Sequence, residues 1–154
     1  MEELFKPLIS AFIGAGISAL VITANNFFSF RSRIDENLRE KRLEVYKILW
    51  KETSVLPKWP RNPDVTYKNL NELSKRFRDW YFNEGGIYLS TQARKAYEVV
   101  QDRISAAVDK HQHELNTPIT YGKNGDYESI RDACSKLRTE LTRDLESRKR
   151  ILFL

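Results

Sequence analysis

The chain has 154 residues, of which 41% are apolar and 31% are charged, and its formal net charge is +5. This length suits one modest domain, and the apolar fraction excludes an intrinsically disordered chain. A single cysteine excludes a disulfide-stapled scaffold, and six glycines with five prolines exclude a fibrous or low-complexity protein.

The first thirty residues contain a long uncharged run. No Asp, Glu, Lys or Arg occurs from Pro7 to Phe30, a stretch equivalent to about 36 Å of α-helix. Because the hydrocarbon core of a bilayer is about 30 Å thick, the run predicts a transmembrane helix over residues 7–30. A cleaved signal peptide, a buried core helix and an amphipathic surface helix are the alternatives, and the last fits less well because neither face of the run is polar. The first fits less well because the chain starts with Glu2 and Glu3, and the second because core helices seldom run this far without a charge.

Basic residues dominate the segment that follows this run. They are Arg31, Arg33, Arg39, Lys41 and Arg42. Since basic flanks stay on the cytoplasmic side, we expect residues 1–6 outside the cell inner membrane and residues 31–154 in the cytoplasm. The same five cations are predicted to contact anionic lipid headgroups.

Small residues form two adjacent rows along the predicted span. One row is Ser10, Gly14 and Ser18, and the other is Ala11, Ala15 and Ala19. Such rows allow two helix backbones to approach closely in lipid, so the pattern predicts self-association and a homo-oligomer. The alternative is that small residues are simply common in membrane spans.

The rest of the chain predicts an all-α protein. Residues 31–42 contain no glycine or proline, and we expect a solvated helical stalk that continues the span. Residues 43–154 then predict a cytoplasmic antiparallel bundle of about four helices. The first of these begins at Leu43, and the others are expected near Tyr67–Asn83, Thr91–Leu115 and Asp126–Arg150.

Local signals mark where these helices begin and end. Asp64 or Thr66, then Ser90, then Asp126 are the expected N-caps. Gly85-Gly86 is expected to end the second predicted helix in the left-handed conformation. Apolar residues at helical spacing predict the core, and they are Leu70, Leu73, Phe77, Trp80 and Tyr81, then Tyr97, Val100, Ile104, Ala107 and Val108, then Ile130, Cys134, Leu137, Leu141 and Leu145.

The residues with reactive or ligating side chains favour packing over chemistry. His111 and His113 lie two apart on a helix and point about 200° from each other, so they cannot share a metal ion. Cys134 falls on an apolar stripe and is expected to be a buried thiol. We therefore predict no catalytic residue, no cofactor and no metal, and the mixed distribution of charges disfavours nucleic acid as a partner.

One aromatic and several basic residues could contact a protein partner. Trp59, in a loop with Pro57, Pro60 and Pro63, is expected to tuck against the end of the bundle, and an exposed anchor is the alternative. The basic candidates are Arg76, Arg78, Arg143 and Arg148. They lie near acidic residues, so interhelical ion pairs and a site for an anion or acidic partner both remain open.

One longer motif supports a family resemblance. The run from Arg78 to Ser90, of the form WYF-x-x-GG-x-x-LS, together with Leu137–Leu145 and Arg148, resembles a group of uncharacterised bacterial proteins. Those proteins carry an N-terminal span and a small helical domain over most of their length. The resemblance implies this architecture and no activity.

The sequence as a whole predicts a single-pass membrane-anchored helical protein. It would act non-enzymatically, through self-assembly or binding of a protein partner at the cytoplasmic membrane face. The alternative is a toxin-like or defence-like effector whose spans oligomerise and perturb the bilayer. An enzyme that uses a surface pocket of Arg, Asp and Tyr is a third possibility with less support.

Overall fold

A computed structural model describes residues 2–122 and 125–146 of the chain, with their side chains except those of residues 2–20, Ala24 and Arg31. The chain divides into two compact units, Met1–Glu40 and Lys41–Leu154. The second unit holds the hydrophobic core and both of the grooves described below.

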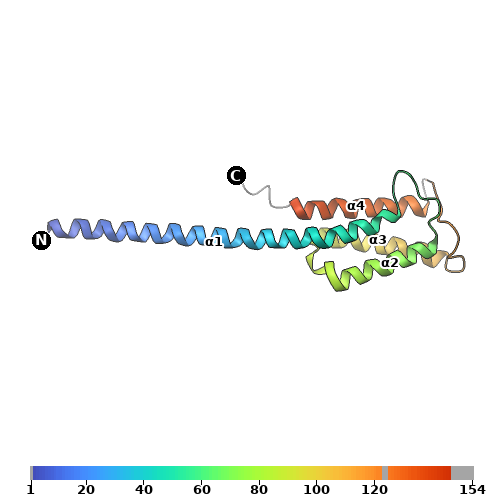
Figure 1. Cartoon of the computed structure of the whole chain (residues 1–154), viewed down its shortest axis with the longest axis horizontal. Helices are drawn as coiled ribbons and strands as arrows, with labels where there is room; N and C mark the ends of the chain where they lie inside the picture. The colour runs from blue at the N-terminus through green and yellow to red at the C-terminus, as the bar shows by residue number, and fades with distance from the viewer. Residues whose placement is uncertain (1, 123–124, 147–154) are drawn as a thin grey trace. The chain divides into compact units, whose positions relative to one another are not determined.

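The described residues form four α-helices and no strand (Figure 1), which confirms the predicted all-α class. The helices are α1 (Glu2–Glu52), α2 (Tyr67–Trp80), α3 (Thr91–Lys110) and α4 (Asp126–Glu146). Short helical turns join them: the 3-10 turn η1 (Thr53–Val55), the π-helical turn η2 (Tyr81–Gly85) and the 3-10 turn η3 (Gly86–Tyr88).

The predicted membrane span belongs to α1, which runs without a break through the predicted stalk at residues 31–42. A search of the described residues found no helix with a stretch long and apolar enough to cross a membrane. The side chains of residues 7–20, the larger part of the predicted span, lie outside that description. So do all six small residues of the two predicted rows: Ser10, Gly14, Ser18, Ala11, Ala15 and Ala19.

The bundle closes around one core, to which α1 contributes from Val45 onward. Tyr46 and Leu49 of α1 are buried, and the predicted stripes of the other helices supply most of the remainder. Tyr81, Val108 and Leu145 are only partly buried at its edge. Each large apolar side chain that leaves water here contributes about 1.5–3 kcal/mol, which offsets the entropy of ordering the helices.

Two of the predicted N-caps are confirmed. Thr66 caps α2 in a capping box, because its Oγ1 accepts a hydrogen bond from the Asn69 backbone while the Asn69 side chain accepts one from the Thr66 backbone. Ser90 caps α3 by accepting a hydrogen bond from the Ala93 backbone N–H at 3.2 Å.

The predicted cap of α4 is wrong. Asp126 is the first residue inside the helix, and its backbone N–H donates to Oγ1 of Thr120 at 3.1 Å. Thr120 therefore performs the capping role from the preceding loop. The Asp126 carboxylate links α4 to α2 and to the preceding loop, because it accepts hydrogen bonds from the hydroxyls of Tyr67 and Thr120.

The predicted left-handed end at Gly85 and Gly86 is also wrong, since their φ angles are −105° and −59°. The glycines are needed for space instead. A Cβ on Gly85 would overlap the ring of Trp80, and one on Gly86 would overlap the carbonyl oxygen of Tyr81. The only positive φ of the described residues belongs to Gly122, at 112°.

The helix ends differ from the predicted ones by several residues. α2 stops at Trp80 and passes into the π-helical turn, and α3 stops at Lys110, five residues before its expected end. The described part of α4 ends at Glu146, so its predicted end at Arg150 lies outside the described residues. Helical periodicity marks the buried stripe of a helix more sharply than its last residue.

Candidate functional site

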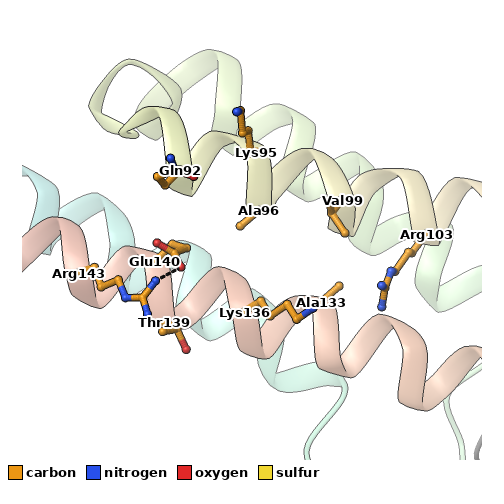
Figure 2. Close-up of a pocket in the computed structure, with 10 residues that line it drawn as sticks. All are labelled: Gln92, Lys95, Ala96, Val99, Arg103, Ala133, Lys136, Thr139, Glu140 and Arg143. Atoms are coloured by element: carbon orange, nitrogen blue, oxygen red, sulfur yellow. Dashed lines mark hydrogen bonds and ion pairs between the residues drawn. The ribbon is translucent and has the colours of Figure 1, made fainter.

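A groove of about 610 Å³ runs between α3 and α4 (Figure 2). Its α3 side is formed by Gln92, Lys95, Ala96, Val99 and Arg103, and its α4 side by Ala133, Lys136, Thr139, Glu140 and Arg143. Arg103 faces the Ala133 end and Gln92 faces the end with Glu140 and Arg143, so the two helices run antiparallel. We call this surface the basic groove.

Four cations and one carboxylate line the basic groove. Arg143 is paired with Glu140 one turn away on α4, and Arg103 donates to the backbone carbonyl of Ser129. Lys95 and Lys136 have no ion pair or hydrogen bond with any residue in the described part of the chain. The groove therefore carries an excess of positive charge that the bundle itself does not neutralise.

The floor of the basic groove is apolar and built from small side chains. Ala133 is buried and Ala96 is partly buried, while Val99 keeps 41% of its surface exposed. Because these side chains are short, an incoming group can approach the two helix backbones closely. The arrangement combines an apolar floor with charged rims on both sides.

A second groove, of about 560 Å³, lies between α1 and α4. It is lined by Leu43, Tyr46, Lys47, Trp50, Lys51, Leu141, Thr142 and Leu145. Leu43 and Trp50 are 44% and 48% exposed, so this surface presents large apolar groups to solvent. We call it the apolar groove.

Trp50 is held in place at the wall of the apolar groove. The guanidinium carbon of Arg138 lies 5.6 Å from the Trp50 ring centroid, which is the geometry of a cation–π contact. Arg138 Nη1 also donates to Oγ1 of Thr53 at 2.8 Å. The hydrogen bond to Thr53 holds the Arg138 guanidinium over one face of the Trp50 ring.

A hydrogen-bond network anchors α1 to the rest of the bundle beside the apolar groove. The Tyr46 hydroxyl lies 2.7 Å from the carbonyl oxygen of Tyr88 and 2.9 Å from Oδ2 of Asp144. The same Oδ2 accepts the Ser90 backbone N–H at 3.0 Å, and Arg42 Nε donates to the Tyr88 carbonyl at 3.0 Å. Burial, followed by the nearby Asp144 charge, raises the pKa of Tyr46, so its phenol stays protonated.

The predicted partner residues that the structure describes do not form one surface. Arg143 lines the basic groove, whereas Arg76 forms an ion pair with Glu52 of α1 at 2.6 Å. Arg78 pairs with its neighbour Asp79, and Arg148 lies outside the described residues. The interhelical ion pair predicted for this group is found at Arg76.

Trp59 is 77% exposed, so the expectation that it tucks against the bundle is wrong. The end of the bundle is already filled by Leu56, Val65 and Ile119, all of which are buried. The exposure of Trp59 matches the alternative of an exposed aromatic side chain.

The predicted lipid-contact residues divide into two groups. Arg33, Arg39 and Lys41 are exposed, whereas Arg42 is partly buried and hydrogen-bonded inside the bundle. The Arg31 side chain lies outside the described set.

His111 and Cys134 take up packing positions, whereas His113 is exposed. The His111 ring stacks on Tyr67 with a centroid distance of 4.0 Å, and its Nε2 lies 3.9 Å from Oδ2 of Asp126. Cys134 is fully buried, as predicted, and burial raises the pKa of its thiol to about 12. The described residues contain no group of side chains that could hold a metal ion.

The sequence interpretation missed most of the basic groove. A signal was present, since Lys95, Val99 and Arg103 follow one another at i, i+4 and i+8 on α3. Lys136 and Glu140 repeat the i, i+4 spacing on α4. Neither helix alone shows that the two faces meet, so the groove becomes visible only when α3 and α4 are packed together.

No protein-family model matches the chain, and no curated protein or solved structure matches it either. The resemblance to uncharacterised bacterial proteins with the WYF-x-x-GG-x-x-LS run therefore stays a prediction.

Proposed function

We propose that the chain is a single-pass membrane-anchored helical protein that acts non-enzymatically by assembling with a second copy of itself. In this proposal residues 7–30 form the anchor in the cell inner membrane, residues 1–6 lie outside and residues 31–154 lie in the cytoplasm. The observation that carries it is the open apolar groove between α1 and α4.

The apolar groove has the composition of a protein interface. Aromatic and aliphatic side chains that sit fixed in a partly open pocket are the groups that dominate binding energy at such surfaces. Trp50 is exposed and already oriented by Arg138, so less side-chain entropy is lost when it is covered. Leu43 extends the same surface by about two helical turns along α1.

A second copy is the occupant that an anchored chain meets first. Copies anchored by the same segment share one orientation relative to the bilayer, and the membrane raises their local concentration. Two parallel copies related by a twofold axis along the membrane normal bring the same surface of each together. The apolar groove supplies the exposed ring of Trp50 together with the aliphatic side chains of Leu43 and Leu145, which can meet the same groups of the second copy.

The basic segment at residues 31–42 supports contact with anionic lipids. Arg33, Arg39 and Lys41 are exposed, and each cation close to an anionic surface adds about 1 kcal/mol of attraction. Arg42 contributes less in this proposal, because its guanidinium is engaged by Tyr88 and Asp144.

The proposal is tested by fractionation and by particle mass. The full chain is expressed in bacteria, and membranes are collected by ultracentrifugation. The protein is then extracted in mild detergent, and the molar mass of the extracted particle is measured by light scattering. We expect the protein in the membrane fraction and a dimer or larger assembly in the extract. Leu43→Lys, which places a charge in the apolar groove, should lower the association constant at least tenfold, about 1.4 kcal/mol.

Ile87→Lys is the matched control, because Ile87 is also a large exposed apolar residue but lies outside the apolar groove. It should assemble like the unchanged protein. Protein that stays in the supernatant without detergent contradicts the anchor. Assembly that survives Leu43→Lys but is lost in Gly14→Leu contradicts the groove and assigns assembly to the span.

A further inference from the structure

We propose that the basic groove between α3 and α4 binds an amphipathic helix of a partner protein, one with an apolar stripe flanked on both sides by Asp or Glu. This inference concerns a different surface from the apolar groove and does not depend on self-assembly. It rests on the shape of the groove, its apolar floor and its uncompensated charge.

The dimensions of the basic groove suit a helix. Gln92 to Arg103 on α3 and Ala133 to Arg143 on α4 each span about 15 Å at 1.5 Å per residue, which is the length of a helix of about three turns. The two helices run antiparallel and form the two walls of the groove (Figure 2). A third helix laid between two others buries one stripe against both of them, as in helix-in-groove recognition.

The floor explains why an apolar stripe is the matching surface. Helices pack with their axes about 8–10 Å apart, and the closest approach requires small side chains at the contact. Ala96 and Ala133 meet that requirement, and Val99 is left with exposed surface that a leucine or valine of the partner would cover. A ligand bound by charge alone would gain no binding free energy from covering this apolar surface.

The rims explain why the flanks of the partner are acidic. Lys95 and Arg103 lie on one wall, and Lys136 and Arg143 lie on the other. Glu140 is engaged by Arg143, so the four cations face one carboxylate that is already paired. An acidic side chain on each flank of the incoming helix would pair with Lys95 and Lys136, which have no partner among the residues that the structure describes.

The distribution of the cations favours an elongated ligand over a single phosphate. Arg103 and Arg143 stand at opposite ends of the basic groove (Figure 2), so they do not converge on one small anion. A nucleic-acid strand would follow the cations, but it would gain little from Ala96, Val99 and Ala133. The apolar floor between the two charged rims therefore favours an amphipathic helix over a small anion or a nucleic-acid strand as the ligand.

The test uses the full chain in lipid nanodiscs and a fluorescein-labelled synthetic peptide of about three helical turns, with leucines along one face and glutamates on both flanks. Binding is followed by fluorescence anisotropy, with empty nanodiscs as the blank. We expect saturable binding that weakens as salt is raised, because the rim contacts are exposed ion pairs. A peptide with lysines in place of the glutamates, and one with alanines in place of the leucines, should each bind at least tenfold more weakly.

Two double variants locate the contact. Lys95→Glu with Lys136→Glu reverses both unpaired cations and should weaken binding by the acid-flanked peptide about tenfold or more. Lys68→Glu with Lys75→Glu makes the same change in net charge on α2, outside the basic groove, and should bind within about twofold of the unchanged chain. Circular dichroism of both variants checks that the helices are retained.

Three results would overturn the proposal. The first is no binding of the acid-flanked peptide at low salt, and the second is equal weakening by the two double variants. The third is tighter binding of a single-stranded DNA probe, or of anionic vesicles, through Lys95 and Lys136 than of the peptide, since the occupant would then be nucleic acid or lipid.

Discussion

Asp144 of α4 forms hydrogen bonds with both α1 and the start of α3. Replacing it tests whether these hydrogen bonds stabilise the bundle. Its Oδ2 lies 2.9 Å from the Tyr46 hydroxyl and 3.0 Å from the Ser90 backbone nitrogen. Ser90 is the N-cap of α3, so the carboxylate also stands at the positive end of that helix. In Asp144→Ala all of these interactions are lost together.

The size of the effect follows from what is left unpaired. A hydrogen bond to a charged group contributes about 1.5–3 kcal/mol, and an orphaned buried N–H costs about 1–3 kcal/mol. The Tyr46 hydroxyl keeps the Tyr88 carbonyl oxygen as an acceptor, whereas the Ser90 N–H loses its partner. Because Asp144 is only partly buried, water can replace some of the loss. We expect Asp144→Ala to lower the free energy of unfolding by about 2–3 kcal/mol.

The assay is urea unfolding of the full chain in mild detergent, followed by far-UV circular dichroism. Asp79→Ala is the control, because Asp79 is exposed and, among the described residues, pairs with its neighbour Arg78 alone. It should change the free energy of unfolding by less than about 0.5 kcal/mol. A double-mutant cycle with Tyr46→Phe should give a coupling of about 1 kcal/mol. If Asp144→Ala is as stable as Asp79→Ala, or if the coupling with Tyr46 is absent, the network does not stabilise the bundle.

Three further predictions concern the core and the caps. Gly85→Ala would drive a methyl group into the Trp80 ring, and we expect a loss of about 1–3 kcal/mol; thermal unfolding measures it, and a melting temperature equal to that of the unchanged chain would refute the close approach. Burial raises the pKa of the Cys134 thiol from 9.0 to about 12. The folded state therefore keeps a proton that the unfolded chain loses, and stability should fall as pH rises above 9, by at most about 1.4 kcal/mol per pH unit. Urea unfolding below and above pH 9 should show a shallower fall in Cys134→Ala, and identical slopes would argue against this contribution. Thr66→Ala and Ser90→Ala each remove an N-cap and should each cost about 1 kcal/mol in urea unfolding; no loss in either would mean that its cap does not stabilise its helix.

Much of the helical bundle was predictable from local pattern. The apolar spacing in α2, α3 and α4 marked the buried stripes, because a helix packed on one core buries one face at a period of 3.6 residues. Thr66 and Ser90 were predictable as caps, since their hydroxyls satisfy backbone groups only three residues away. Asp126 was not, because the group that caps α4 comes from Thr120 across a loop.

The candidate surfaces were harder to predict, because each depends on two helices at once. The sequence predicted Arg143 as a partner residue because of its charge. Lys95 and Lys136 are recognised as part of the same groove only when α3 and α4 are packed side by side. Trp59 was expected to be covered, yet Leu56, Val65 and Ile119 fill that end of the bundle. Sequence spacing predicts which residues share a face of one helix, but it does not predict which residues of another helix pack against that face.

The sequence by itself determined that the chain is helical, where three of its helices begin, and that an uncharged run of 24 residues precedes a basic segment. These properties are local, since they depend on hydrogen bonds and apolar contacts within a few residues. Tertiary structure alone decided that Gly85 and Gly86 serve close packing and that Asp144 joins three elements. It also decided that α4 has an apolar groove on one side and a basic groove on the other. Those features arise from residues far apart in the chain, and only the packing of the helices brings them together.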